Sequence, residues 1–237
     1  MHTCLSPCSG LDMSPREVVN AALAMGLDLI GVCDHNSAEN ALAVKKAGSR
    51  NGLMVLGGME VTSSEEAHIL VFFDDDDDLL GFQEFIYRHL EGTNDEHAFG
   101  MQVIADDEDG VSGFCDRLLI TATSLPAEAI VAAARRAKNE SLVVAAHVDR
   151  ESFSLIGQLG FIPSTLVLDA VEVSAQTTAS VARERFPDCR KYPIITGSDA
   201  HNPADIGKRF TWFTVKDGTV PEIKKALIGR DGRKSEC

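Results

Sequence analysis

Residues 27–61 read LDLIGVCDHNSAENALAVKKAGSRNGLMVLGGMEV, and this stretch decides the fold. Two mainly apolar runs, 27–33 and 53–61, flank a segment with helical spacing at 38–47. Such continuous runs are typical of parallel strands covered on both faces, and the helix between them supplies the crossover. The same alternation recurs through most of the chain and predicts an α/β protein.

The number of strand patterns favours a barrel of β/α units. We count about seven, and the count predicts an irregular or incomplete barrel better than eight regular repeats. Helices are expected near 79–91, 127–138 and 177–185, one more begins at Pro15, and Thr219 caps the last. The expected strands cover residues 27–33, 53–61, 69–73, 142–147, 169–173, 193–197 and 210–215.

The chain is expected to form one domain over residues 1–237, because no linker-like stretch divides it. Residues 95–124 lack a helical period, and Asp109-Gly110 predicts a hairpin turn there. This segment is either a flap over the site or an insertion. The five aspartates at 74–78 predict a solvated loop.

Several apolar runs end on side chains that bind metal well. In a parallel barrel the carboxyl ends of the strands meet at one face, so these side chains predict a shared metal site. Imidazoles with a bridging carboxylate are typical of hydrolytic sites that hold more than one ion. The residues at these strand ends are Asp34, His35, Glu60, His147, Asp199 and His201.

Two further residues depend on local geometry. His68 stands at the start of its strand, so an antiparallel turn over residues 62–67 would return it to Glu60 and let the pair share one ion. Arg150 follows His147 closely and either clamps a substrate phosphate or forms a surface salt bridge.

The net charge of −14, from 36 acidic and 22 basic residues, predicts repulsion of long polyanions. We therefore expect a small phosphorylated substrate or a short oligonucleotide as the partner, and no duplex nucleic acid. The six cysteines form no CxxC pair, which favours reduced thiols in the cytoplasm. No apolar run approaches the roughly 20 residues that span a bilayer, so no membrane association is expected.

Six motifs taken together resemble those of the polymerase and histidinol phosphatase (PHP) family. The resemblance runs from residue 2 to about residue 207. It implies a distorted seven-stranded, TIM-like β/α barrel, two or three ions of zinc, manganese or iron, and hydrolysis of phosphate esters. The motifs are His2-Thr3, CDHN at 33–36, GGMEV at 57–61, HIL at 68–70, AHVDR at 146–150 and GSDAH at 197–201.

The resemblance also implies roles for the motif residues. Glu60 matches the bridging carboxylate, and His68 and His147 match its partners on one ion. His2 and Asp199 match ligands of a second ion.

A third ion would be held by His35 and His201. Cys8 falls in the region where relatives place a further His or Asp, so it is a candidate ligand. Asp34 would orient a neighbouring ligand without binding metal itself.

The sequence departs from the family pattern at its start. The family opens with a strand ending in His-x-His, and Met1 stands where the middle residue would be. Either the true start lies upstream of Met1, or the first strand is truncated. Truncation would expose a sheet edge, which predicts association into a homo-oligomer or reduced stability.

Our leading hypothesis is hydrolysis of a phosphate ester by a water that the ions activate, with Glu60 bridging the ions and Arg150 stabilising charge on phosphorus. The runner-up is a degenerate PHP barrel that serves as a non-catalytic binding or regulatory module. Exonuclease action on a short nucleic acid is a third possibility. The general acid is not identified.

Overall fold

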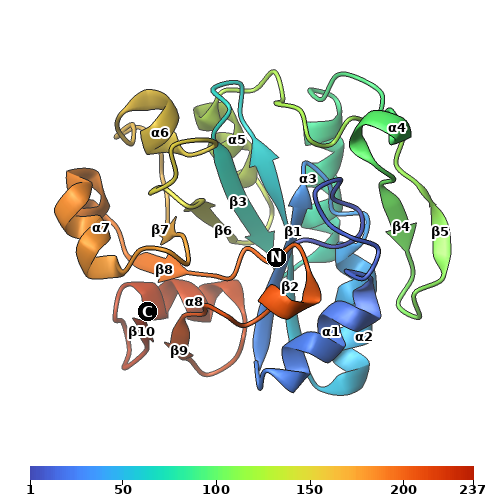
Figure 1. Cartoon of the computed structure of the whole chain (residues 1–237). Coiled ribbons are helices and arrows are strands. Elements are labelled where there is room, and N and C mark those ends of the chain that lie inside the picture. Colours follow the sequence, from blue (N-terminus) through green and yellow to red (C-terminus); the bar gives the residue numbers. More distant parts are fainter.

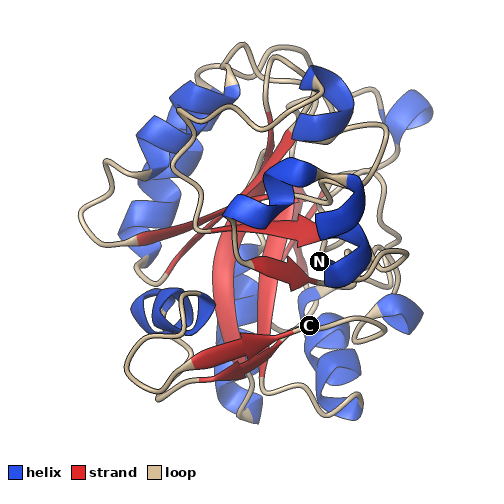
Figure 2. Cartoon of the chain, turned by 90° about the vertical axis from the view of Figure 1, so that its left-hand side faces the viewer, coloured by secondary structure: helices blue, strands red, loops and turns tan.

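A computed structural model describes residues 1–237. Its centre is a single mixed sheet of six strands in the order β1-β2-β3-β6-β7-β8. The strands turn strongly relative to one another, so the sheet is curled into a half-barrel (Figure 2). The strands are β1 (Leu29–His35), β2 (Met54–Thr62), β3 (His68–Phe73), β6 (Ser141–Ala145), β7 (Ala170–Val173) and β8 (Ile194–Thr196).

β3 is the one strand of this sheet that runs against its neighbours. It pairs antiparallel with both β2 and β6, whereas β1–β2, β6–β7 and β7–β8 are parallel. The short turn after β2 places His68 opposite Thr62. The antiparallel return of the chain through the VTSSEEA segment at 61–67, on which the pairing of His68 with Glu60 depended, is therefore present.

Helices surround the curled sheet (Figure 1), and α1 and α2 lie side by side against the β1–β2 edge. None of them combines the length and hydrophobicity needed to cross a lipid bilayer. The helices are α1 (Pro15–Ala24), α2 (Ala41–Asn51), α3 (Asp76–Tyr87), α4 (Glu96–Phe99), α5 (Ala127–Ala134), α6 (Leu155–Leu159), α7 (Ala179–Arg185) and α8 (Val220–Leu227), with short 3-10 helices at Pro187–Lys191 and Pro203–Asp205.

The two faces of the sheet have different neighbours. Along β2, Met59 and Val61 belong to the largest apolar cluster, in which the sheet packs against α3 and α5. Leu56 faces the opposite, concave side, where Ile223 of α8 packs. Side chains alternate along a strand, so Glu60 also faces the concave side. The curled sheet thus carries apolar residues deep on this face and acidic and imidazole groups at its rim.

The strand predicted at 210–215 forms, but the prediction that it joins the main sheet is wrong. β9 (Trp212–Thr214) pairs antiparallel with β10 (Lys234–Glu236) in a separate two-stranded sheet. β1 and β8 are the ends of the main sheet and do not pair with each other, so a closed TIM-like barrel is not observed. The apolar pattern of residues 210–215 did not distinguish a core strand from this small ribbon.

The first two residues lie between the ends of the main sheet. The Met1 amino group donates to Gly31 O at 3.2 Å, and Met1 O accepts from the Cys33 N–H at 3.0 Å. On the other side, the His2 N–H donates to Ala200 O at 3.0 Å. These bonds place Met1 beside β1 and hold His2 at the rim.

Two local predictions had different outcomes. The hairpin at Asp109-Gly110 is present between β4 (Val103–Ala105) and β5 (Val111–Phe114). The solvated loop at 74–78 is wrong for most of its length, because α3 begins at Asp76 and the Asp75 carboxylate accepts from the Asp78 N–H at 3.0 Å. Carboxylates satisfy free N–H groups at a helix start, so an aspartate run suits this position.

Candidate metal centre

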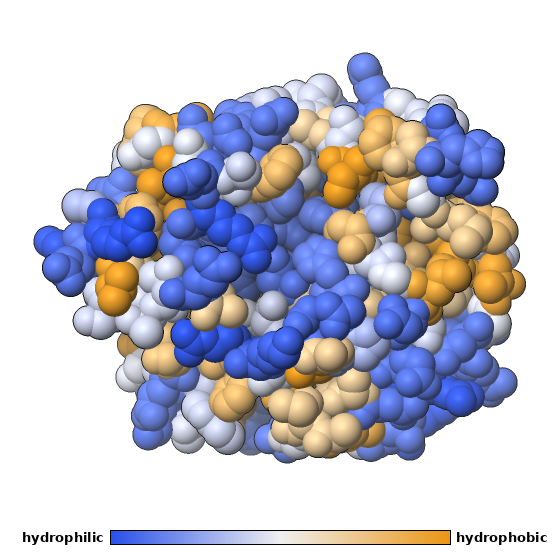
Figure 3. Space-filling model, viewed as in Figure 1, coloured by the Kyte–Doolittle hydropathy of each residue, from blue (hydrophilic) through white to orange (hydrophobic).

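The predicted ligands converge at one end of the curled sheet. Glu60 and His35 lie near the ends of β2 and β1, and His68 begins β3. Loops after β6 and β8 supply His147, Asp199 and His201, and the segment before α1 supplies His2 and Cys8. The space-filling view shows a hydrophilic hollow in the middle of this face (Figure 3). The cavity has a volume of about 730 Å³, and its lining includes Cys8, His35, Glu60, His68, His147, Asp199 and His201.

Glu60 is the centre of the site. Its Oε1 lies 2.8 Å from His68 Nδ1 and 3.2 Å from His147 Nε2. Its Oε2 lies 3.0 Å from His2 Nε2. The two oxygens thus face different histidines, which is the orientation that a bridging carboxylate requires.

Asp199 lies next to Glu60, and His2 contacts both. Asp199 Oδ1 is 3.2 Å from His2 Nε2, while Oδ2 is 2.7 Å from Arg150. Asp199 and His147 have φ angles of 46° and 27°, a backbone region that residues other than glycine rarely adopt. Strain of this kind concentrates at functional sites, where the surrounding structure holds it in place.

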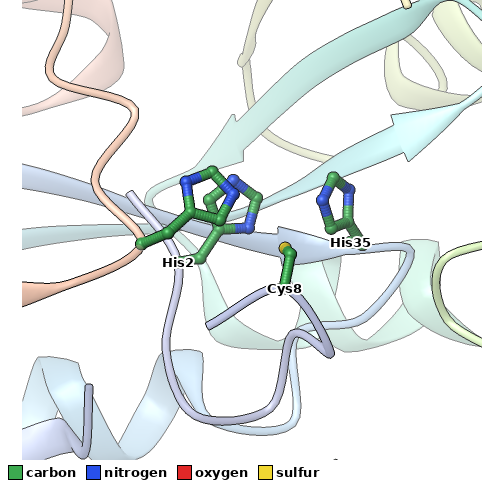
Figure 4. A group of neighbouring side chains, drawn as sticks. His2, Cys8 and His35 are labelled. Atoms are coloured by element: carbon green, nitrogen blue, oxygen red, sulfur yellow. The ribbon is translucent and has the colours of Figure 1, made fainter. Parts of the chain in front are cut away.

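A second set of donors lies beside this one. His2, Cys8, His35 and His201 have ligand atoms within 4.8 Å of one another. The His2 and His201 rings stack with their centroids 4.2 Å apart. Figure 4 shows Cys8 beside the rings of His2 and His35, with its sulfur turned toward them.

The charged groups of the cluster shift one another's pKa values. Burial disfavours charge on His2, but the carboxylates of Asp199 and Glu60 outweigh it and raise the His2 pKa to about 9. Burial would raise the pKa of Glu60, yet the surrounding histidines, His68 foremost, hold it well below its usual range. Burial and the neighbouring His2 lower the pKa of His35, which is therefore a neutral imidazole with a free lone pair.

The donor set fits divalent cations. Five imidazoles, two carboxylates and one thiol reach the cluster, and these are the ligands that zinc and related metals prefer. His147 Nδ1 is buried without a partner in the chain. Burial and the Asp34 carboxylate raise the pKa of Cys8 to about 12, so its sulfur is a thiol until a cation binds.

Asp34 does not contact the cluster directly. Its carboxylate accepts from the Thr3 N–H at 2.6 Å and from Ser6 Oγ at 2.7 Å. Ser6 Oγ in turn lies 3.0 Å from His2 Nδ1. This chain of contacts links Asp34 to the His2 ring through Ser6, and His2 Nε2 faces Glu60 and Asp199.

The sequence did not identify three residues of the site. Arg185, the last residue of α7, lines the cavity together with Arg150. Phe153 stacks on His68 with centroids 5.0 Å apart. Buried Glu172 accepts from the His147 N–H at 3.3 Å, and burial raises its pKa to about 7. The sequence could have pointed to Glu172, because it is the one acidic residue within the apolar run AVEV at 170–173. The local sequence around Arg185 does not indicate a functional role.

Known proteins share this fold and segments of this sequence. Residues 183–228 match a family model described as PHP-associated. The uncharacterized protein YqxK of Bacillus subtilis (strain 168) is 23% identical over 92% of this chain and 56% of its own length. This chain thus spans about half the length of that relative.

Two solved structures carry the fold comparison. Endonuclease Q from Pyrococcus furiosus aligns with a TM-score of 0.72 and 21% identity over 99% of this chain and 56% of its own. A protein from Bifidobacterium adolescentis, proposed to be a metal-dependent phosphoesterase, aligns with a TM-score of 0.60 and 19% identity over 97% and 94% of the two chains.

The curled six-stranded half-barrel and the convergent donor cluster define a mixed α/β protein whose fold is consistent with a PHP-type barrel. The PHP-associated segment and the shared fold confirm the resemblance to the PHP family that the motifs indicated.

The exclusion of duplex nucleic acid is wrong. A structure of Endonuclease Q holds a 27-mer duplex substrate with an abasic lesion at the active site, and this chain matches it with a TM-score of 0.72. Net charge sums over the whole surface and does not describe the cavity, which is lined by Arg150 and Arg185 as well as by four acidic residues. Divalent cations bound there would offset those acids. The local field at a site can therefore oppose the overall charge.

Proposed function

We propose that this chain is a metal-dependent hydrolase that cleaves a phosphate ester at the Glu60 cluster. One observation carries the proposal: Glu60, 2% exposed, directs its two oxygens at different histidines, with Asp199 beside them. Buried carboxylates and imidazoles at such spacing are costly to fold unless they serve a shared ligand. The structural neighbours, an endonuclease and a phosphoesterase, support hydrolysis in general.

The candidate ligands divide into three sets around Glu60. His68 and His147 face Oε1, and His2 and Asp199 lie on the side of Oε2. Cys8, His35 and His201 form the third set. Divalent cations bound there would lower the pKa of a water molecule and neutralise charge on the phosphoryl oxygens.

Arg150 has the position for a role in binding the phosphate. Its guanidinium contacts Asp199 with one nitrogen, and the side chain is 45% exposed at the cavity. Its remaining N–H groups can donate to phosphate oxygens while Asp199 holds the side chain in place. Arg185 adds a second cation to the same cavity lining.

The test is hydrolysis of a generic phosphate ester with added manganese or zinc, by wild type and by Glu60→Gln. We expect turnover by the wild type and a loss of at least about a hundredfold in the variant, since Glu60 would be the carboxylate shared by the ions. Equal rates for the two proteins would refute the proposal. Asp12→Asn, a surface carboxylate outside the cavity lining, is the matched control and should retain full activity.

A second candidate substrate is a phosphodiester within nucleic acid. The shared fold with Endonuclease Q and the two arginines at the cavity favour it. Wild-type protein would be offered a duplex containing one abasic site, the matched undamaged duplex and a small phosphate ester. Cleavage of the lesion duplex alone would assign an endonuclease-like activity, whereas turnover of the small ester alone would favour a phosphatase.

A further inference from the structure

We infer that Phe153, together with Ile120, forms a subsite for a planar aromatic group that the substrate carries next to its phosphate. The inference rests on the proposed function and deepens it by naming the class of substrate, which is an aryl phosphate or a nucleotide and not a simple sugar or alkyl phosphate. Both side chains line the cavity that contains Glu60. Figure 3 shows apolar residues at the rim of the hydrophilic hollow.

Phe153 lies next to the metal centre without belonging to it. Its ring stacks on that of His68, with the centroids 5.0 Å apart and an angle of 22° between the planes. His68 Nδ1 in turn lies 2.8 Å from Glu60 Oε1. A phosphate bound by ions at Glu60 would therefore place the group attached to it within reach of the Phe153 ring.

Contact with His68 does not account for the whole Phe153 side chain. Phe153 is 46% exposed, whereas His68 is buried. Stacking covers one face of the ring, and the exposed area leaves the rest available at the cavity. An aromatic ring with a free face stacks favourably on a second planar ring, so a ligand with such a ring gains a contact that an alkyl group does not.

The backbone holds Phe153 in this position at an energetic cost. Its φ angle of 58° lies in the left-handed region that bulky residues rarely adopt. Two hydrogen bonds fix the segment: Phe153 O accepts from the His68 N–H at 3.0 Å, and Ser154 Oγ donates to Arg150 O at 2.6 Å. Strain that the surroundings maintain in this way concentrates at ligand-binding positions.

Ile120 supplies a second apolar side chain from a distant part of the sequence. It is 37% exposed and lines the same cavity. The carbonyl oxygens of its neighbours, Leu119 and Thr121, each accept from Asn36 Nδ2 at 2.8 Å. Asn36 follows His35 directly, so the segment that carries Ile120 is fixed to the rim that carries the candidate metal ligands. Two separately anchored apolar side chains thus stand in a lining that is otherwise mainly polar.

Binding of non-hydrolysable phosphonates tests the inference without turnover. Methylphosphonate, cyclohexylphosphonate and phenylphosphonate would be titrated into the zinc-loaded protein by isothermal titration calorimetry. We expect the wild type to bind phenylphosphonate about three- to tenfold more tightly than cyclohexylphosphonate, because only the planar ring stacks on Phe153. The phosphonate analogues of AMP and of ribose 5-phosphate form a second pair. The pair with the larger ratio shows whether an aryl group or a nucleobase is the preferred ring.

Variants separate stacking from structural support. Phe153→Leu should abolish the preference for a planar ring and leave the binding of methylphosphonate unchanged, while Phe153→Tyr should retain the preference. Phe161→Leu is the matched control, because Phe161 is also exposed but lies outside the cavity lining.

Three results would overturn the inference. They are the absence of a planar-ring preference in both pairs, the absence of any phosphonate binding, and an equal loss for all phosphonates in Phe153→Leu, which would mean that Phe153 only supports His68. A planar-ring preference in a protein that hydrolyses no ester would uphold the subsite and defeat only the proposed hydrolysis. Hydrolysis without the preference would defeat the subsite alone.

Discussion

At the residue scale, the geometry of the site depends on hydrogen bonds that fix the orientation of a few side chains. The Asp34 carboxylate accepts a hydrogen bond from Ser6 Oγ, which in turn contacts His2 Nδ1. The other ring nitrogen, His2 Nε2, faces Glu60 and Asp199. Each contact removes one alternative orientation before any ligand binds. Such preorganisation lowers the cost of assembling a metal site, because the entropy of ordering the side chains is lost on folding.

Protonation of His2 should stabilise the metal-free protein. Its pKa is raised from 6.5 to about 9 in the folded state, so the charged form contributes fully below pH 6.5 and the contribution is lost as pH rises through 9. The loss should be on the order of 3 kcal/mol or less, measured by urea unfolding in the presence of a chelator. His2→Gln should remove most of this pH dependence; an identical profile in the variant would contradict the account.

Arg185 should contribute to substrate binding more than to turnover. It lines the cavity away from the Glu60 contacts, so Arg185→Ala removes a cation that helps hold a phosphate. Hydrogen bonds to charged groups are worth about 1.5–3 kcal/mol, so KM should rise about tenfold with little change in kcat. Arg183→Ala on the same helix is the control, because Arg183 does not line the cavity. An equal effect of both variants would argue for a general charge effect.

At the element scale, strand direction decides which residues meet. β3 runs antiparallel to β2, so its first residue, His68, reaches the last part of β2 and lies 2.8 Å from Glu60. A parallel β3 would have sent His68 to the opposite end of the sheet. The carboxyl ends of the other strands meet at this same rim, as expected for parallel β/α units.

The aspartate run provides an element-scale prediction. Asp75 caps α3 through the Asp78 N–H, so Asp75→Ala should lower the free energy of unfolding by about 1 kcal/mol. Asp77→Ala, which changes an exposed first-turn aspartate without removing the cap, should cost only a few tenths of a kcal/mol. Thermal or urea unfolding measures both. Equal losses would mean that charge near the helix start, and not the capping bond, is the stabilising factor.

At the scale of the whole molecule, the fold opens where a barrel would close. β1 and β8 remain unpaired with each other, and Met1 and His2 occupy the rim between them. A second cavity of about 470 Å³ is lined largely by apolar residues, and its lining also includes Met1, Glu60 and Glu172. The candidate metal centre is therefore built from β1, β2, β3 and several loops of an open sheet, without the continuous ring that a closed barrel provides.

The sequence predicted the features that repeat and missed those that arise from long-range packing. CDHN, GMEV and SDAH follow apolar strands, so their convergence could be expected from the geometry of β/α units. Residues 212–214 also form a strand, but only tertiary contacts decide that it pairs with β10. Arg185 is the last residue of α7, and the sequence around it does not indicate a functional role. The net charge also misled, because it does not indicate where on the surface the charges lie.

The most direct test of the central claim is the metal content of the purified, metal-loaded protein, measured by inductively coupled plasma mass spectrometry. If Glu60 joins ions held by His2, Asp199, His68 and His147, the wild type should bind at least two equivalents, and Glu60→Gln should lose one or more. Less than one equivalent in the wild type, or equal content in both proteins, would contradict a shared metal centre.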